Sequence, residues 1–510
     1  MAWLSDASSI EVLLDMDKEF GVEFSTGRKL SADMNIWLLE FDTQKYSTDE
    51  VLQALHLHPE VIMAQSNHRL QKRETTPSDP DFTQQWALNN DGGGTAVEGA
   101  DIHITDAWDI TTGGPTVHGD EIVIAVIDDG FDLNHEDLTF WKNTDETPGD
   151  GDDADNNGYI DDYDGWDAHD DDGTLPSAFH GTHVSGIAAA KGDNGMGISG
   201  VIWDAEVMPI HCDVEEDEVV AAYGYVYSQR KLYNETNGQK GAFVVVTNSS
   251  FGVDFADPED YPIWCAMYDS LGALGILNAT ATINSYVNVD VQGDVPTGCA
   301  SDHVIAVTNT DNRDELTFSG YGPETIDLGA PGEGIFSTTP SDGYGFSTGT
   351  SMSSPHVAGA VALMFAAACE KFMNDYKFSP GTMSLLLKDY LLESVDLIPD
   401  LVNLSVSEGR LNVYQALLAL QNNYCSPTGL ENILETSIKI YPNPTSNLVT
   451  IDGMNEKTII YLTSLSGQQL GAYETQGSSL QIGTGDLPSG MYFLELVNDK
   501  GIVSTRLIVE

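Results

Sequence analysis

Ser351 combines a reactive hydroxyl with surroundings that suit either a structural or a catalytic role. It lies in the stretch GTSMSSPHVAG, residues 349–359, and the apolar run that follows, AVALMFAAACE, predicts a buried helix. Serine is a common N-cap residue, so the hydroxyl could close the first turn of that helix. The alternative is a nucleophile at the positive end of the helix dipole, where small neighbouring residues let a substrate backbone approach.

A serine nucleophile needs a base, and the base needs a carboxylate to orient it. The stretch FHGTHVSG places His180 at the start of a predicted helix, and VIAVIDDG places Asp128 at the end of a predicted buried strand. Ligands gather at the carboxyl ends of strands in open α/β sheets. Taken singly, the aspartate suits a turn and the histidine suits a helix cap. Together with Ser351, the two residues indicate nucleophilic catalysis.

A second group of residues, between Asp128 and His180, has the chemistry of a metal site. From residue 145 to residue 172 the chain holds thirteen carboxylates and no lysine or arginine. Part of this run follows the calcium-loop pattern D-x-[DN]-x-[DN]-G. The predicted Ca²⁺ ligands are Asp153, Asp155, Asn157, the carbonyl group of Tyr159, Asp161 and Asp164. A solvated acidic loop without an ion is the alternative.

The elements that must position these residues lie between residues 75 and 423. Short apolar runs such as EIVIAVID, AEVMPI, AFVVVTNSS and GILNATA are typical of buried parallel strands. Helical stretches such as GTHVSGIAAAK lie between these runs. The alternation predicts an α/β domain whose mostly parallel sheet is covered by helices on both faces.

The two ends of the chain differ from this middle part. Residues 1–74 hold seven lysines and arginines against thirteen acidic residues, with a predicted strand at NIWLLEFD and a capped helix at STDEVLQALHLHP. They predict a small α+β domain. Residues 424–435 have the composition of a linker. Residues 436–510 contain short alternating strands between Gly, Asn and Ser turns, at IKIYPNP, LVTIDG, TIIYLTS, SLQIGT, GMYFLELVND and VSTRLIVE. This last part predicts a β-sandwich.

Charge is the most unusual bulk property of the chain. Its 510 residues include 80 Asp and Glu against 21 Lys and Arg, a formal net charge of -59. Such a surface repels nucleic acid and anionic membranes and attracts cations. The sequence contains no apolar run long enough to span a membrane, so we expect no transmembrane helix.

Cysteine usage and the N-terminus bear on where the protein works. Five cysteines in this length do not make a disulfide scaffold; Cys265 with Cys299 and Cys369 with Cys425 are candidate pairs, and the connectivity stays open. The first twenty residues lack the basic segment, apolar core and cleavage site of a signal peptide. Either the protein is cytoplasmic or the sequence begins after a removed signal.

The stretches VIDDG, HGTHVSG and GTSMSSPHVAG resemble the three catalytic blocks of the subtilisin-like serine proteases, the subtilases. The resemblance covers most of residues 75–423 and implies a subtilisin-like fold. It implies that Ser351 attacks the scissile carbonyl, that His180 is general base and then general acid, and that Asp128 orients the imidazole. His183, in the same block as His180, is expected to be structural.

The same resemblance implies the remaining parts of the site. The segment GILNATATIN fits the family's oxyanion-hole segment and ends at Asn284, although Ile283 stands where the family commonly has glycine. Losing such a donor costs about 2.7–4 kcal/mol of transition-state stabilisation. SSFG is similar to the substrate-binding strand, so Ser250, Phe251 and Gly252 are expected to pair with the peptide by β-addition. Similar acidic loops occur in calcium-binding subtilases.

Both ends of the chain also resemble known domains. Residues 1–74 are similar to a subtilase propeptide, which assists folding and inhibits the enzyme until it is cleaved off. The tail, with IYPNPTSNLVTI and LPSGMYFLELVNDKG, is similar to the C-terminal sorting domain of type IX secretion. These resemblances imply secretion to the medium or cell surface, a removed signal peptide, and the type IX machinery as a partner.

The sequence therefore predicts a secreted, calcium-supported serine endopeptidase that hydrolyses proteins or peptides. A catalytically silent subtilase that serves as an adhesin or binding protein is the alternative from another class, and the intact catalytic blocks speak against it. A narrow processing protease is a further alternative to a broadly degrading one.

Overall fold

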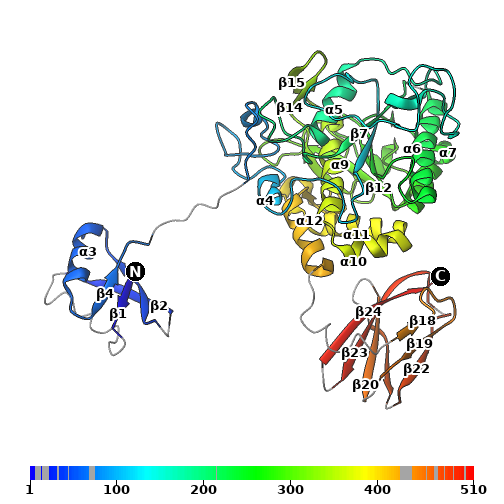
Figure 1. The fold of residues 1–510 in the computed structure, drawn as a ribbon. Helices are drawn as coiled ribbons and strands as arrows, with labels where there is room; N and C mark the ends of the chain where they lie inside the picture. Colours follow the sequence, from blue (N-terminus) through cyan, green and yellow to red (C-terminus); the bar gives the residue numbers. More distant parts are fainter. Residues whose placement is uncertain are drawn as a thin grey trace. The chain divides into compact units, whose positions relative to one another are not determined.

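The computed structural model consists of two compact units, residues 1–73 and 74–510 (Figure 1). It describes residues 1–5, 13, 22–31, 34–43, 45–67, 75–213, 215–425, 439–454, 457–464, 469–475, 477–485, 487–498 and 501–509. The expected boundary at residue 74 and nearly all of the expected linker at 424–435 lie outside the described residues.

The first unit is a small antiparallel sheet with one described helix. The strands, as far as they are described, lie in the order β2-β3-β1-β4. Their bounds are Ala2–Leu4 (β1), Phe24–Ser31 (β2), Ile36–Phe41 (β3) and Val61–Ala64 (β4), and helix α3 spans Thr48–Leu57. Ser47 caps α3 through a reciprocal capping box with Glu50. The predicted strand and capped helix are therefore confirmed.

The second unit is built on a long, almost wholly parallel sheet. Within the described part of the chain it has nine strands in the order β16-β17-β13-β12-β10-β8-β5-β7-β6. Only the edge pair β16–β17 is antiparallel. The bounds are Val123–Asp128 (β5), Trp166–Asp167 (β6), Glu206–His211 (β7), Val244–Ser249 (β8), Leu277–Ala281 (β10), Val304–Thr310 (β12), Leu328–Pro331 (β13), Asp396–Leu397 (β16) and Gly409–Arg410 (β17).

Both faces of this sheet are buried, as the continuous apolar runs predict. Along β5, Ile124 and Val126 belong to one core cluster, whereas Val123, Ala125 and Ile127 belong to another. The alternation follows because successive side chains of a strand point to opposite faces. Helices α5, α9, α10, α11 and α12 contribute to the first cluster, and α6 and α7 contribute to the second. The predicted α/β architecture is confirmed.

The helices of this unit are Ile104–Trp108 (α4), Phe179–Ala189 (α5), Glu216–Thr236 (α6), Pro262–Ala273 (α7), Val289–Gln292 (α8), Thr350–Ala367 (α9), Glu370–Phe378 (α10), Pro380–Glu393 (α11) and Val413–Leu420 (α12). Two short strand pairs complete it: Val253–Asp254 (β9) with Asp294–Val295 (β11), and Ile335–Thr339 (β14) with Gly343–Ser347 (β15). Among the described residues no single helix is long and apolar enough to cross a membrane. Helices α9 and α10, bent by 110° relative to each other, would together be long and apolar enough, by length and composition alone.

The C-terminal residues form two antiparallel sheets. As described, β18-β19-β22 make one and β21-β20-β23-β24 make the other. The strands are Lys439–Tyr441 (β18), Leu448–Asp452 (β19), Thr458–Ser464 (β20), Gln469–Thr475 (β21), Ser479–Gly483 (β22), Gly490–Asn498 (β23) and Gly501–Val509 (β24). They enclose a core of their own that includes Val449, Ile460 and Leu494. These sheets fit the predicted β-sandwich, although no strand was predicted at the position of β21.

Two disulfides join the candidate cysteine pairs, Cys265 with Cys299 and Cys369 with Cys425. Among the described residues Cys212 is left as a buried free thiol. Burial raises its pKa far above the ordinary thiol value, which makes it unreactive.

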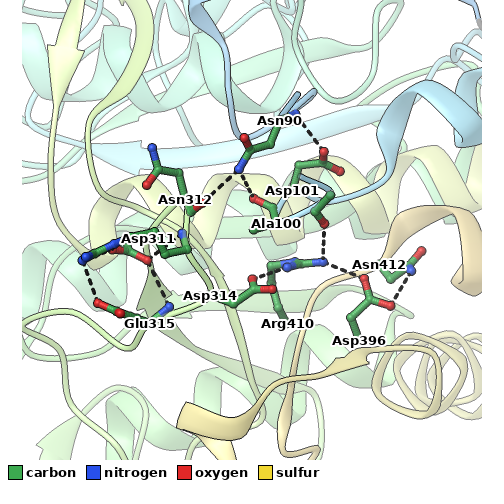
Figure 2. A network of polar contacts seen from close by, with 12 residues as sticks. Asn90, Ala100, Asp101, Asp311, Asn312, Asp314, Glu315, Asp396, Arg410 and Asn412 are labelled. Carbon is green, nitrogen blue, oxygen red and sulfur yellow. Dashed lines mark hydrogen bonds and ion pairs between the residues drawn. The ribbon is translucent and has the colours of Figure 1, made fainter. Parts of the chain in front are cut away.

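Arg410 in β17 lies at the centre of a polar network that joins three distant segments (Figure 2). Its side chain is only 2% exposed, yet it pairs with the carboxylates of Asp314 and Asp396. It donates to Asp396 over 2.6 Å and to the carbonyl oxygen of Gly99 over 3.1 Å. Asn412 donates to the second oxygen of Asp396. One buried guanidinium thus holds together the loop near residue 99, the loop after β12 and the sheet edge.

Candidate active site

The parallel order of the sheet places Asp128 and His180 side by side. Asp128 is the last residue of β5, and His180 is the second residue of α5. The Nδ1 atom of His180 lies 2.7 Å from Oδ1 of Asp128. A Cβ atom on Gly181 would lie 2.3 Å from the carbonyl oxygen of Gly130, so only glycine permits this close approach of helix and loop. Asp128 is therefore placed to orient the imidazole.

The electrostatics of His180 suit a base. Burial lowers the pKa of His180, but the charge of Asp128, its hydrogen bond and the nearby charge of Asp129 outweigh burial and hold the pKa above 6.5. The Asp129 carboxylate also accepts a hydrogen bond from the backbone N–H of Gly181 over 3.0 Å. The neutral imidazole is thus a stronger base than an ordinary histidine.

Ser351 is the second residue of α9, and Gly349 is the N-cap. The N-cap interpretation of Ser351 is therefore wrong. Its hydroxyl donates to the carbonyl oxygen of Ser250 over 3.1 Å, and the Ser250 hydroxyl donates back to the carbonyl oxygen of Ser351 over 2.9 Å. Helices α5 and α9 pack against each other, which brings the helix starts that carry His180 and Ser351 to one side of the sheet.

Asn284 is held by the residue that precedes Ser351. Its Oδ1 atom accepts hydrogen bonds from the backbone N–H of Thr350 over 2.9 Å and from the Thr350 hydroxyl over 3.2 Å. With Oδ1 engaged, the Nδ2 group is the part of the amide left to donate. A site beside Ser351 with one side-chain donor and the backbone N–H of a helix start can stabilise an oxyanion.

We expect Asn284→Ala to lower kcat by about 10²–10³-fold with little change in KM, because the donor acts only on charge that develops in the transition state. Steady-state kinetics on a short chromogenic peptide would measure both constants. A kcat near that of the unchanged chain would mean that another group supplies the second donor.

The segment expected to bind substrate follows β8 directly. Ser250, Phe251 and Gly252 link β8 to β9, and Ser250 is the residue that exchanges hydrogen bonds with Ser351. A Cβ atom on Gly252 would lie 2.4 Å from the carbonyl oxygen of Val295, so this backbone packs directly on β11. Ile283 stands where the subtilases commonly have glycine. Its side chain is buried in the second core cluster, to which α6 and α7 also contribute.

His183 has the structural role that was expected. Its Nε2 atom contacts the carbonyl oxygen of Gly345 at 3.1 Å, and its ring stacks on Phe179. Burial lowers the pKa of His183 to about 4, so the ring stays neutral.

The acidic run assembles a compact carboxylate cluster. Ligand atoms of Glu146, Asp155 and Asp162 all lie within 4.8 Å of one another, and the three residues are buried. The Oε2 atom of Glu146 is buried without a hydrogen-bond partner among the described residues. Burial raises the pKa of Asp162 to about 6 despite hydrogen bonds from Tyr225 and asparagine side chains. Buried carboxylates this close repel one another unless positive charge or protons neutralise them.

The predicted calcium ligands take different positions around this cluster. Asp155 belongs to it, and Nδ2 of Asn157 donates to Asp155. The other three predicted carboxylates have different partners. Asp153 accepts hydrogen bonds from the backbone N–H groups of Asn157 and Gly158, and Asp161 accepts them from the backbone N–H groups of Asp150 and Gly151. Asp164 forms an ion pair with Lys142. Tyr159 packs its ring against Trp166 and Tyr225. Glu146 and Asp162 are not among the ligands predicted from the sequence, although both lie in the same acidic run.

Comparison with known families covers most of the second unit. Residues 119–409 match the subtilase family, and residues 439–510 match the secretion system C-terminal sorting domain. The first match contains Asp128, His180, Asn284 and Ser351.

Curated relatives of the chain are proteases. An extracellular protease of Xanthomonas campestris is 30% identical over 62% of this chain and 52% of that protein. An extracellular basic protease of Dichelobacter nodosus is 30% identical over 62% of this chain and 53% of that protein. The major intracellular serine protease of Bacillus subtilis is 32% identical over 50% of this chain and 72% of that protein. The chain spans about half the length of the first two.

Proposed function

The chain belongs to the subtilase family, and on that premise we propose that it is a secreted serine endopeptidase that hydrolyses peptide bonds through an acyl-enzyme on Ser351. The observation that carries the proposal is the 2.7 Å contact between His180 and Asp128, with Ser351 at the start of a helix that packs against the helix of His180. A silent binding protein has no use for an imidazole oriented by a buried carboxylate at that place.

The proposed reaction uses only groups of this chain. Substrate binding displaces the Ser351 hydroxyl from the carbonyl oxygen of Ser250, and rotation of the side chain turns it toward His180. His180 takes the hydroxyl proton while the oxygen attacks the scissile carbonyl, and Asp128 stabilises the imidazolium that forms. His180 then protonates the leaving amine, and water hydrolyses the ester by the same steps.

The oxyanion that forms in each step is stabilised by two donors. The backbone N–H of Ser351 at the start of α9 is one, and Nδ2 of Asn284 is the other. Ser250, Phe251 and Gly252 supply the edge on which the peptide is added as a strand.

Cleavage of a peptide library, measured with and without calcium, tests the proposal and reports the preferred residues around the cut. Hydrolysis that stops after treatment with a fluorophosphonate supports a serine endopeptidase. Tight binding of protein partners without cleavage would support the alternative, a subtilase-fold adhesin. Cleavage confined to one short motif would indicate a processing protease.

We also propose that the carboxylate cluster holds Ca²⁺ through Glu146, Asp155 and Asp162. Calcium takes oxygen ligands, and the cluster offers three carboxylates with one orphaned oxygen, Oε2 of Glu146. Asn143 and Asn157 contact the same carboxylates and complete the polar shell. The bound ion supplies structural charge, tying the loop after β5 to α6 through the contacts of Tyr225 and Gln229 with Asp162.

We expect millimolar calcium to raise the melting temperature and chelation to speed autolysis. The gain in unfolding free energy follows mass action and reaches about 2.7 kcal/mol at a calcium concentration of 100 Kd. Differential scanning fluorimetry on inactivated enzyme would measure it. Glu146→Gln should remove the calcium-dependent rise, whereas Asp170→Asn, an exposed carboxylate of the same run, should keep it. If Asp161→Asn removes the calcium-dependent rise in melting temperature and Glu146→Gln does not, the ion is held instead by the ligands predicted from the calcium-loop pattern of the sequence.

We propose the remaining domain roles from the resemblances. Residues 1–74 act as a propeptide that inhibits the domain of residues 75–423 until cleavage, and residues 424–435 are a linker. Residues 436–510 are the sorting domain, recognised by the type IX secretion machinery. The sorting domain assigns the protein to the cell surface or the medium.

Deleting residues 436–510 should leave kcat/KM on a short peptide within about threefold, because the deleted strands have their own core and carry none of the catalytic residues. The same deletion in the native host should retain the protein inside the cell. Cell fractionation and peptide kinetics measure the two effects. Loss of activity on short peptides would make the tail part of the catalytic fold.

A further inference from the structure

Asp294 is a buried carboxylate that the reaction described above does not use. It is 2% exposed and begins β11, which pairs with β9 directly after the substrate-binding segment. A carboxylate in such a place is retained only when donors satisfy it. Burial raises the pKa of Asp294, and its hydrogen bonds from Thr297, Thr282 and Ile283 act against that rise.

Among the described residues, three donors bond the Asp294 side chain at one oxygen, and two of them belong to the segment that carries Asn284. Oδ2 accepts from the Thr282 hydroxyl over 2.7 Å, from the backbone N–H of Ile283 over 3.2 Å and from the Thr297 hydroxyl over 2.6 Å. Thr282 and Ile283 are the two residues that separate the end of β10 from Asn284. The Thr282 N–H still donates to the carbonyl oxygen of Val307 in β12, whereas the Thr282 hydroxyl and the Ile283 N–H turn to Asp294.

The same segment is held on its other side by the neighbour of the nucleophile. The Thr350 hydroxyl donates to the carbonyl oxygen of Thr282 over 2.5 Å, and its backbone N–H donates to Oδ1 of Asn284 over 2.9 Å. Residues 282–284 are thus clamped between Asp294 and Thr350. An oxyanion donor must be held in place before charge develops, because reorganisation during the reaction costs rate.

We infer that Asp294 is a positioning residue that holds Thr282 and Ile283 so that the amide of Asn284 stays aimed at the developing oxyanion. The inference rests on the proposed function. It requires that Asp294 act on the transition state through Asn284 and that it contribute little to ground-state binding of the peptide.

A double-mutant cycle tests the inference. Asp294→Ala should lower kcat about tenfold with KM within about twofold, the effect of one or two net hydrogen bonds. In an Asn284→Ala background the same change should lower kcat by less than about twofold, since the donor that Asp294 positions is already absent. Asp294→Asn, which keeps an acceptor oxygen, should restore most of the rate.

Thr282→Val and Thr297→Val form a matched pair that needs no change of charge. Each removes one hydroxyl donor to the same oxygen of Asp294, but only Thr282 lies on the segment of Asn284. Thr282→Val should lower kcat about fivefold and Thr297→Val less than about twofold, at comparable melting temperatures. This pair carries the test if Asp294→Ala does not fold.

Two results would overturn the inference. One is an equal loss of kcat from Asp294→Ala with and without Asn284. The other is a change, in Asp294→Ala, of KM or of the preference for lysine over leucine at the P1 position of the substrate. Such a change would make Asp294 a specificity residue. If the unchanged enzyme hydrolyses no peptide at all, the proposed function itself fails, and that outcome is visible before any variant is compared.

Discussion

Ser351→Ala should lower kcat on the order of 10⁶-fold and abolish labelling by a fluorophosphonate, because the attacking oxygen is gone. The fold should persist, since the Ser351 hydroxyl makes one hydrogen bond in the described part of the chain, to the carbonyl oxygen of Ser250. Active-site titration and steady-state kinetics on the peptide found by library cleavage measure the two effects. The variant should also accumulate with residues 1–74 attached if the chain cleaves its own propeptide.

The matched control for this experiment lies two residues along the same helix. Ser353 is fully buried, and its hydroxyl has no hydrogen-bond partner among the described residues, so Ser353→Ala removes no hydrogen bond seen there. It should keep wild-type labelling and kcat within about threefold. Residual labelling of Ser351→Ala at the level of this control would show that the nucleophile is a different residue.

Arg410→Met should lower the free energy of unfolding by about 3 kcal/mol, at the lower end of the range for breaking a buried ion pair. The side chain of Arg410 is 2% exposed, whereas those of Asp314 and Asp396 are 22% and 35% exposed and regain some hydration when the guanidinium is removed. Urea unfolding of the Ser351→Ala background, which prevents autolysis, would measure the change.

Arg313→Met provides the comparison, at a side chain whose two partners, Asp311 and Glu315, are labelled in Figure 2. The Arg313 side chain pairs with Asp311 and Glu315 but is 43% exposed, so its loss should lower the free energy of unfolding much less than the loss of Arg410. Equal destabilisation by the two substitutions would mean that burial of the guanidinium does not decide the stability of this region.

The strands and helices could be read largely from the sequence, and so could the positions of the proposed catalytic residues, because each has a local signature. The run EIVIAVID is apolar on both faces, and it became β5 with side chains in two core clusters. Asp128 and Ser351 follow such signatures directly, at a strand end and a helix start. The resemblance of the three blocks to the subtilases then supplied their roles. The exception, β21, is polar and glycine-containing, so its alternation is weak.

The acidic loop shows what local spacing could not decide. A loop template assumes that carboxylates at fixed intervals converge on one point. In the folded chain Asp153 and Asp161 turn to backbone N–H groups nearby, because an exposed loop satisfies those donors first. Glu146 and Asp162 converge with Asp155 because α6 supplies Tyr225 and Gln229 to hold Asp162 from behind. The cluster depends on a helix more than sixty residues away from Asp162 in the chain.

The orientation of Asn284 was likewise set by tertiary structure alone. The sequence places an asparagine after a buried strand, but its amide oxygen is engaged by Thr350, 66 residues later, and the backbone of the preceding Ile283 is bound by Asp294 in another strand pair. Hydrogen bonds between side chains far apart in sequence form only where packing of the sheet brings their segments together. Residue types and local periodicity determine which elements form, whereas the register of the parallel sheet and the packing of α9 on it decide which polar groups meet.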